Sequence, residues 1–208
     1  MDFFKKKCGF EKSLAVLGEK GFCEEYAEQL NRELGEAVRK QDIARGKSML
    51  ANALLILGRL SEAYAVFEDT EIKDLERALQ GNLVGNMIFC KFVQDDFKTA
   101  DELYRTYNAA VLGERSDVMK RSLAIHEHIS GRYENSVEII AKMLDSECRF
   151  LDICMVKSML RLDMFERAAE FAAGFDRYKD CAQLSDEVSK LKSKVMGGLP
   201  SGKRTRKH

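Results

Sequence analysis

A short pattern of bulky, small and apolar residues occurs five times along the chain and constrains its fold more than any other feature. In each copy a bulky apolar residue stands three positions before a small one, and apolar residues follow at the third and fourth positions after it. The small residues are Ser13, Ala63, Ala100, Ser136 and Ala168. The last three intervals lie close to about 34 residues, a period typical of helical-hairpin repeats.

This spacing has a physical cause. Apolar residues at positions i, i+3 and i+4 form one stripe along a helix, and that stripe must be buried against another element. A small residue lets two helices approach closely, because a larger side chain would hold their backbones apart. Since no single hairpin covers its own stripe, hairpins stack side by side. We therefore predict an all-α protein made of stacked antiparallel helix hairpins.

Longer periodic segments precede four of the five copies and predict the first helix of each hairpin. The predicted first helices are Arg45–Leu57, Leu75–Val93, a segment from an N-capping Ser116 to Ile129, and Arg149–Leu162. Gly58 and Gly131 follow two of these helices as C-caps. We therefore expect two helices per repeat between residues 43 and 175.

The two ends of the chain depart from this scheme. Phe22–Lys40 is predicted to be one long helix, which makes residues 10–40 a degenerate or capping first repeat. Asp180–Met196 is predicted to be an amphipathic helix that covers the last hairpin. The repeat domain then spans residues 1–196, and residues 197–208, which have no apolar periodicity, form a flexible basic tail.

Composition excludes several other classes of protein. The chain has one proline, Pro200, and lacks the frequent turn clusters of an all-β protein. No apolar run is long enough to span a membrane, and Lys5–Lys7 interrupt the stretch where a signal peptide would be apolar. The six cysteines stand singly and form no Cys-x-x-Cys pair, which favours buried, reduced thiols. We expect a cytoplasmic protein, with the nucleus as the alternative.

No arrangement of residues indicates catalysis. The sequence contains no glycine-rich phosphate loop, no His-Glu-x-x-His pair and no nucleophile elbow. His126 and His128 are two positions apart on a predicted helix, so they point to different faces and cannot share a metal ion. The sequence therefore predicts a protein that is not an enzyme and has no metal site and no cofactor.

The C-terminal tail carries concentrated positive charge. From Val188 onward the chain has seven basic residues and no acidic one. Four of the basic residues stand close together after a Gly-Gly-Leu-Pro-Ser-Gly spacer: Lys203, Arg204, Arg206 and Lys207. Such a cluster could neutralise RNA phosphates, with an affinity that falls as salt rises. The alternatives are a nuclear-import signal and an end that only promotes solubility.

The repeat resembles the tetratricopeptide (TPR) family over about residues 10–175. Two copies follow the family pattern most closely, at Leu50, Ala51, Gly58, Ala63 and Phe67, and again at Leu123, Ala124, Gly131, Ser136 and Ile140. The proline that ends helices in the family is absent from every copy, and residues 80–95 fit only in a shifted register. The resemblance implies a TPR-like solenoid of stacked hairpins, which the predicted C-terminal capping helix and short disordered basic tail complete.

In TPR-like solenoids the first helices line a concave face that holds a protein partner as a peptide or a helix. The polar and charged residues at the corresponding positions are Arg45, Ser48, Asn52, Asn82, Asn86, Arg121, His128 and Lys157. An asparagine amide can donate to a peptide backbone and accept from it at the same time. The alternative is that these side chains only solvate the helices.

Two further stretches resemble one branch of the TPR proteins. They are similar to the TPR-bearing seventy-two-kilodalton subunit of the signal recognition particle. The first stretch is Leu54–Thr70, and the second is Asp74–Arg77 followed by Asn82-Leu83. The resemblance implies a TPR part that binds the smaller partner subunit. It also implies that Leu199, Pro200 and the Lys203–Lys207 cluster form a shortened RNA-binding segment. The tryptophan-containing motif and most of the lysine-rich region of that family are missing.

Two functions from different classes follow. One is a ribonucleoprotein scaffold, a signal recognition particle subunit that binds a protein through its concave face and RNA through its tail. The other is a general protein–protein adaptor of a coat, chaperone or degradation complex, in which the tail is incidental or serves nuclear import.

Overall fold

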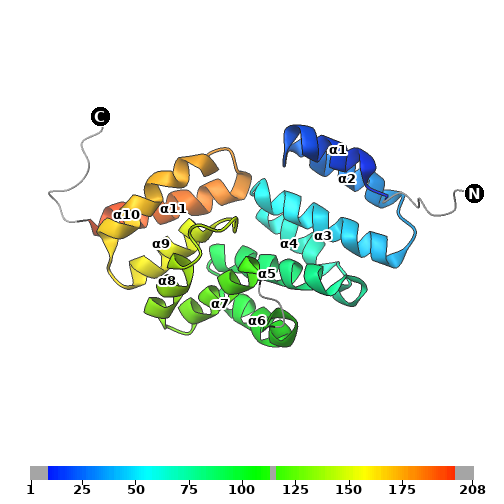
Figure 1. Ribbon diagram of the computed structural model, residues 1–208. Helices are drawn as coiled ribbons and strands as arrows, with labels where there is room; N and C mark the ends of the chain where they lie inside the picture. The colour runs from blue at the N-terminus through cyan, green and yellow to red at the C-terminus, as the bar shows by residue number, and fades with distance from the viewer. Residues whose placement is uncertain (1–8, 113–115, 200–208) are drawn as a thin grey trace, which may run out of the picture.

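The computed structural model describes residues 9–112 and 116–199, and within these ranges all regular secondary structure is helical (Figure 1). It contains eleven α-helices and two short 3-10 helices there, and no strand. The predicted all-α class is therefore confirmed. No helix among these residues is both long and apolar enough to cross a membrane.

Most helices come in pairs joined by short turns. The pairs are α1 (Glu11–Lys20) with α2 (Glu24–Gly35), α3 (Lys40–Ile56) with α4 (Leu60–Glu68), α5 (Arg77–Val93) with α6 (Phe97–Leu112), α7 (Asp117–Ile129) with α8 (Tyr133–Ala141), and α9 (Leu151–Arg161) with α10 (Phe165–Ala172). The remaining elements are η1 (Ile72–Asp74), η2 (Ala173–Tyr178) and the long α11 (Ala182–Gly198).

From the second pair onward, the first helices pack against one another in chain order, and the first pair joins them through α2. Helix α3 contacts α5, α5 contacts α7, and α7 contacts α9, while each also packs on the second helix of its own pair. Figure 1 shows the result as an arc that runs from α1–α4 through α5–α7 to α8–α11. The inner side of this arc is formed by residues of the first helices, which is where the candidate site lies.

The small residues of the repeat lie where the expected close approaches occur. All five are at most 1% exposed: Ser13, Ala63, Ala100, Ser136 and Ala168. Gly85 has the same role between α5 and α7, because a Cβ atom there would lie 2.5 Å from Cγ1 of Val118. A larger residue at this position would push the two first helices apart.

Glycines end two of the first helices as predicted. Gly58 and Gly131 both have φ of +77°, in the left-handed region that glycine adopts without a steric penalty. The amide groups of Arg59 and Arg132 donate back to the carbonyl oxygens of Leu54 and Glu127, which closes the last turn of each helix. The chain can then reverse sharply into α4 and α8.

The predicted single helix over Phe22–Lys40 is wrong. Helix α2 ends at Gly35, and α3 begins at Lys40 after a non-helical segment. The apolar stripe of α2 ends before this segment. The one large apolar residue of the segment, Val38, is 89% exposed. With no apolar contact to extend the helix, a turn that lets α3 pack on α2 is preferred. The first copy of the repeat also lies in the first helix of its pair, α1, whereas the others lie in second helices.

Two boundary details also differ from expectation. Helix α7 begins after Ser116 as predicted, but the Ser116 side chain makes no capping hydrogen bond. Helix α11 runs to Gly198, two residues further than predicted, and Leu199 is only 8% exposed. The helical domain therefore includes the residues at which the predicted tail began. The predicted RNA-binding residues Lys203, Arg204, Arg206 and Lys207, with Pro200, lie outside the described residues.

The beginning of α11 contacts the turn between α3 and α4, far away in the sequence (Figure 1). The Leu184 amide donates to the Gly58 carbonyl oxygen at 3.1 Å. In return, Oε1 of Gln183 accepts a hydrogen bond from the Ser61 amide at 2.8 Å. The fit is tight, since a Cβ atom on Gly58 would lie 2.3 Å from the Cys181 carbonyl oxygen. We call these residues the closing contact, because they join the last helix to the second pair.

Candidate functional site

A groove of about 690 Å³ lies on the inner side of the arc. Its walls come from α3, α5 and the start of α7, together with Phe22 and residues 147–150 of the loop between α8 and α9. Six of the eight residues predicted to bind a partner line it: Arg45, Ser48, Asn52, Asn82, Asn86 and Arg121. The groove thus gathers polar side chains from three successive first helices.

Three of these side chains form a hydrogen-bonded chain across the helices. The Asn86 amide donates to Oδ1 of Asn52 at 3.2 Å, and Oδ1 of Asn86 accepts from an Arg121 guanidinium nitrogen at 2.7 Å. Arg121 also donates to the carbonyl oxygens of Gly85 at 3.3 Å and Arg149 at 3.0 Å. This polar chain fixes α3, α5, α7 and the α8–α9 loop relative to one another.

Arg121 is the unusual residue among these three hydrogen-bonded side chains. Its side chain is only 1% exposed, and its guanidinium lies over the Phe89 ring at 4.8 Å. All of its hydrogen-bond acceptors among the described residues are neutral oxygens, and its Nε has no acceptor there. Because a buried charge is costly unless it is well bonded, the acceptors that it does have matter to the stability of the fold.

Ser48 and Asn82 contrast with the polar chain. Both are partly exposed in the groove, and neither side chain forms a hydrogen bond with the described residues. Asn82 lies one helical turn before Asn86, so the two amides project from the same face of α5. Ser48 and Asn82 are therefore two uncharged groove groups whose hydrogen-bonding capacity remains available to another molecule.

The loop before α9 supplies groove residues that the repeat pattern did not indicate. Arg149 lies over the Phe22 ring at 5.6 Å, and Phe150 stacks on Phe89 with ring centroids 4.8 Å apart. Phe150 adopts φ of +67°, a left-handed conformation that is uncommon for a bulky residue. A loop has no helical periodicity, so no signal in the sequence could have placed these side chains over the groove.

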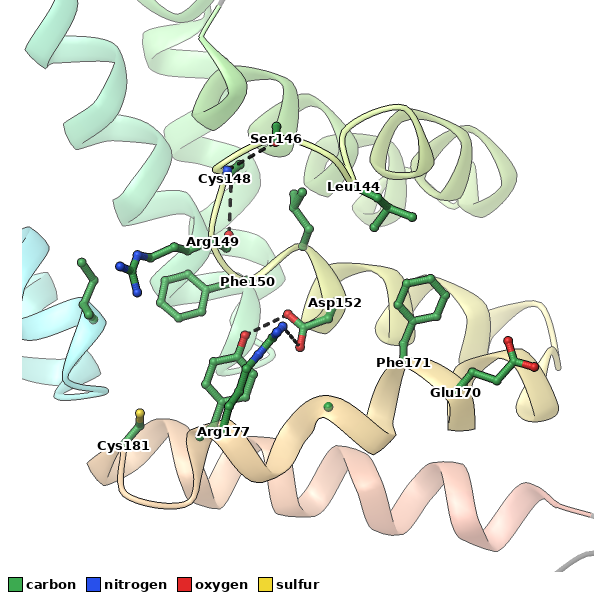
Figure 2. A pocket seen from close by; sticks show the side chains of 14 residues that line it. Leu144, Ser146, Cys148, Arg149, Phe150, Asp152, Glu170, Phe171, Arg177 and Cys181 are labelled. Carbon is green, nitrogen blue, oxygen red and sulfur yellow. Dashed lines mark hydrogen bonds and ion pairs between the residues drawn. The ribbon is translucent and has the colours of Figure 1, made fainter.

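A second chamber of about 680 Å³, shown in Figure 2, lies beside the groove at this loop. The two share the side chains Ile56, Cys148, Arg149 and Phe150. In Figure 2, Leu144 and Phe171 lie toward the opposite side of the chamber from Arg149. The two spaces therefore adjoin at this loop.

Asp152 anchors η2 to α9 in this chamber. Its carboxylate accepts a hydrogen bond from the Tyr178 hydroxyl at 2.9 Å and pairs with the Arg177 guanidinium at 2.6 Å. Burial, followed by the neighbouring Asp152 charge, raises the pKa of Tyr178. The phenol therefore remains a neutral donor, and the three side chains hold the wall of the chamber in place.

The other two predicted residues, His128 and Lys157, do not lie in the groove. The Lys157 ammonium donates to the carbonyl oxygens of Phe92 at 2.9 Å and Val93 at 3.1 Å, and it pairs with Asp95. It thus caps the C-terminal end of α5, where a positive charge is favourable. His128 Nδ1 lies 2.9 Å from the Ser158 hydroxyl. Their positions in the repeat turn them toward a separate cavity bordered by α9, α10 and α11.

The described residues offer no group of three histidine, cysteine or acidic side chains that could hold a metal ion. The five cysteines in the same ranges are free thiols. Burial raises the pKa of Cys90 and of Cys154 to about 12, so both stay protonated at neutral pH. Groove and chamber present amide, hydroxyl, guanidinium and carboxylate groups beside apolar surface, a mixed lining of the kind found in binding sites.

Comparison with known proteins gives no match: no family model, no curated protein and no solved structure is significantly similar to the chain.

Proposed function

We propose that this chain is a non-enzymatic scaffold, a TPR-like solenoid whose inner groove holds a segment of a partner protein. The observation that carries the proposal is the convergence of polar residues from α3, α5 and α7 in one groove of about 690 Å³. A volume of several hundred Å³ accommodates several side chains of an extended segment. The stacking of first helices on one another supports the solenoid reading, because it leaves their inner faces uncovered.

Recognition of such a segment rests on the groups that remain available for bonding. The Asn82 amide can donate to a peptide carbonyl oxygen and accept from a peptide N–H, and the Ser48 hydroxyl can do either. Each hydrogen bond to an uncharged peptide group contributes about 0.5–1.5 kcal/mol. The polar chain of Asn52, Asn86 and Arg121 keeps the groove walls in register.

A quantitative pull-down from native extract tests this function. The full chain is compared with the double variant Ser48→Ala and Asn82→Ala, and co-purifying proteins are measured with and without nuclease. Loss of two hydrogen bonds worth about 1 kcal/mol each lowers the retention of the specific partner about tenfold or more. The matched control is Asn31→Ala with Ser189→Ala, two exposed residues that do not line the groove. Equal retention by the two double variants would show that the partner docks elsewhere.

A narrower version of the proposal makes the chain a signal recognition particle subunit. In it, the groove holds the partner subunit, and the Lys203–Lys207 cluster contacts RNA. It rests on the sequence resemblance and on the charge of the tail. The test is RNA binding at low and moderate salt by the full chain and by a chain that ends at Leu199. Leu199 is kept because it is buried.

Salt-sensitive RNA binding that disappears with the truncation supports the ribonucleoprotein version. Absence of RNA binding by the full chain at low salt contradicts it. The general adaptor of a coat, chaperone or degradation complex, with an incidental or nuclear-import tail, then remains. The groove experiment is unaffected by this outcome, because it does not involve the tail.

A further inference from the structure

The cavity that contains His128 and Lys157 is distinct from the groove and has a different chemistry. It has a volume of about 490 Å³ and lies where the turn between α5 and α6 meets α9, α10 and α11. Its apolar wall consists of four side chains from four different helices: Phe97, Leu160, Phe165 and Leu191. Cavities of this size with mostly apolar walls and a few polar groups are typical of small-molecule sites.

The charged groups around this cavity are unbalanced. Three cations line it, Lys157, Arg161 and Lys194, against one carboxylate, that of Asp95. Lys157 pairs directly with Asp95, and Lys194 lies 3.7 Å from the same carboxylate. Arg161 donates to the Tyr133 hydroxyl and has no acidic partner among the described residues. The lining thus has a net charge of +2 with His128 neutral.

The state of His128 agrees with this excess of positive charge. Its side chain is 4% exposed. Burial, followed by the charges of Lys157 and Arg161, lowers its pKa to about 4. The same positive field that disfavours a protonated imidazole favours an anion in the cavity.

The two exposed cations keep donors for a ligand, because Lys194 makes only a 3.7 Å contact with Asp95 and Arg161 bonds only to the Tyr133 hydroxyl among the described residues. Lys157 is 9% exposed, and its hydrogen bonds to Phe92, Val93 and Asp95 use all three of its donors. Arg161 and Lys194 are both exposed and lie at the margin of the apolar wall. An anionic head group can meet these two cations while a hydrocarbon body covers the wall.

We infer that this cavity binds a small amphipathic anion, in which a hydrocarbon or aromatic body carries one carboxylate or sulfonate group. The head group pairs with Arg161 and Lys194, and the body packs against Phe97, Leu160, Phe165 and Leu191. Burial of the apolar body contributes about 25 cal/mol per Å² of surface removed from water. The site is independent of the groove and of any protein partner.

The test uses the full chain with two defined probes. The fluorescence of 1-anilinonaphthalene-8-sulfonate reports saturable binding, and decanoate is added as a competitor. We expect one site per chain, displacement by decanoate, and far weaker displacement by decanol, which has the same chain length without the charge. In the double variant Arg161→Ala with Lys194→Ala, probe affinity falls about tenfold or more, as expected for the loss of two charge-assisted contacts.

The matched control is Lys190→Ala with Lys192→Ala. These two residues on α11 pair with Glu187 and Asp176 and do not line the cavity, so the change in net charge is the same. The inference is overturned if no saturable binding is found, if both double variants bind the probe equally, or if decanol competes as well as decanoate.

Discussion

Asn82 and Asn86 lie one turn apart on α5 and carry the same side chain, yet the fold uses them differently. Asn86 is 8% exposed and bonds to both Asn52 and Arg121, whereas Asn82 has no hydrogen bond to the described residues. The sequence treats them as equivalent groove residues. The structure makes Asn86 part of the support of the groove and leaves Asn82 available to a ligand.

We therefore expect the same substitution to lower stability at Asn86 and to leave it almost unchanged at Asn82. Asn86→Ala takes one acceptor from the buried Arg121 guanidinium, so it lowers the free energy of unfolding by about 1–3 kcal/mol. Asn82→Ala removes no bond within the protein and changes that free energy by less than about 0.5 kcal/mol. Urea unfolding followed by circular dichroism measures both. Equal stability of the two variants would contradict the assigned roles.

The buried imidazole of His128 makes stability depend on pH. Its pKa is about 4 in the folded chain and about 6.5 when unfolded. Between these values the unfolded chain binds the proton and the folded chain does not. The contribution of His128 is therefore complete above pH 6.5 and is lost as the pH falls toward 4. The loss amounts to about 3 kcal/mol over the whole interval.

The variant His128→Gln should be less stable than the wild type at pH 7.5, because it loses ring contacts with Phe92 and Tyr133. Its stability should nevertheless fall less steeply between pH 6.5 and 4.5. Urea titrations across this range give the slopes. Parallel curves for His128→Gln and the wild type would rule out a buried neutral imidazole.

Helix α1 shows how a short helix is stabilised by a residue outside it. A ten-residue helix is marginal by itself. The buried Glu33 of α2 accepts hydrogen bonds from the amides of Lys12 and Ser13, each at 3.0 Å. A carboxylate at this end satisfies two free N–H groups and interacts favourably with the helix dipole. The first pair of helices is thus held together by more than its apolar contacts.

Replacement of Glu33 by Gln tests this capping contact. We expect Glu33→Gln to lower the free energy of unfolding by about 1–2 kcal/mol and to speed amide hydrogen exchange within α1. Glu28→Gln is the matched control, because Glu28 is exposed on the same helix and caps nothing. Unchanged exchange in α1 of the Glu33 variant would show that apolar packing alone holds the helix.

For helices with a full apolar stripe, most of the ends predicted from the sequence lie within about two residues of the observed ends. The start of α3 is the exception. Burial of the stripe dominates their energetics, and it depends on residues three and four apart. The prediction fails at 36–39, between α2 and α3, where helical propensity is high but no apolar contact exists. There the packing of α3 on α2 decides the conformation.

The closing contact links elements from the two halves of the chain. It joins residues 122 positions apart, Ser61 and Gln183, and brings α11 against the turn at Gly58. Each of the two hydrogen bonds gives an acceptor to a free N–H group in the first turn of a helix. Gly58 accepts from Leu184 in α11, and Gln183 accepts from Ser61 in α4. An array of hairpins that ended without such a contact would be held only by neighbouring repeats.

Comparison of Gly58→Ala with Gly131→Ala separates the stability that the closing contact contributes from the backbone strain of an alanine at positive φ. Both glycines have φ of +77° and end a first helix with the same hydrogen bonds, so the backbone cost of alanine is alike, about 1–2 kcal/mol. A Cβ atom at Gly131 meets nothing within 4 Å, whereas one at Gly58 collides with Cys181. We expect Gly58→Ala to be the more destabilising by about 1 kcal/mol or more, with faster hydrogen exchange at the start of α11. Equal losses would mean that the contact adds no stability.

The sequence by itself determined the helical class, most of the pairing and the burial of the small repeat residues. It also indicated six residues of one groove, because all of these follow from a periodicity that is local in the chain. Only the tertiary structure decided that His128 and Lys157 face another cavity, that the α8–α9 loop borders the groove, and that α11 returns to Gly58. The path of the arc is the sum of small rotations at every helix interface, so contacts between distant repeats depend on the packing of all side chains between them.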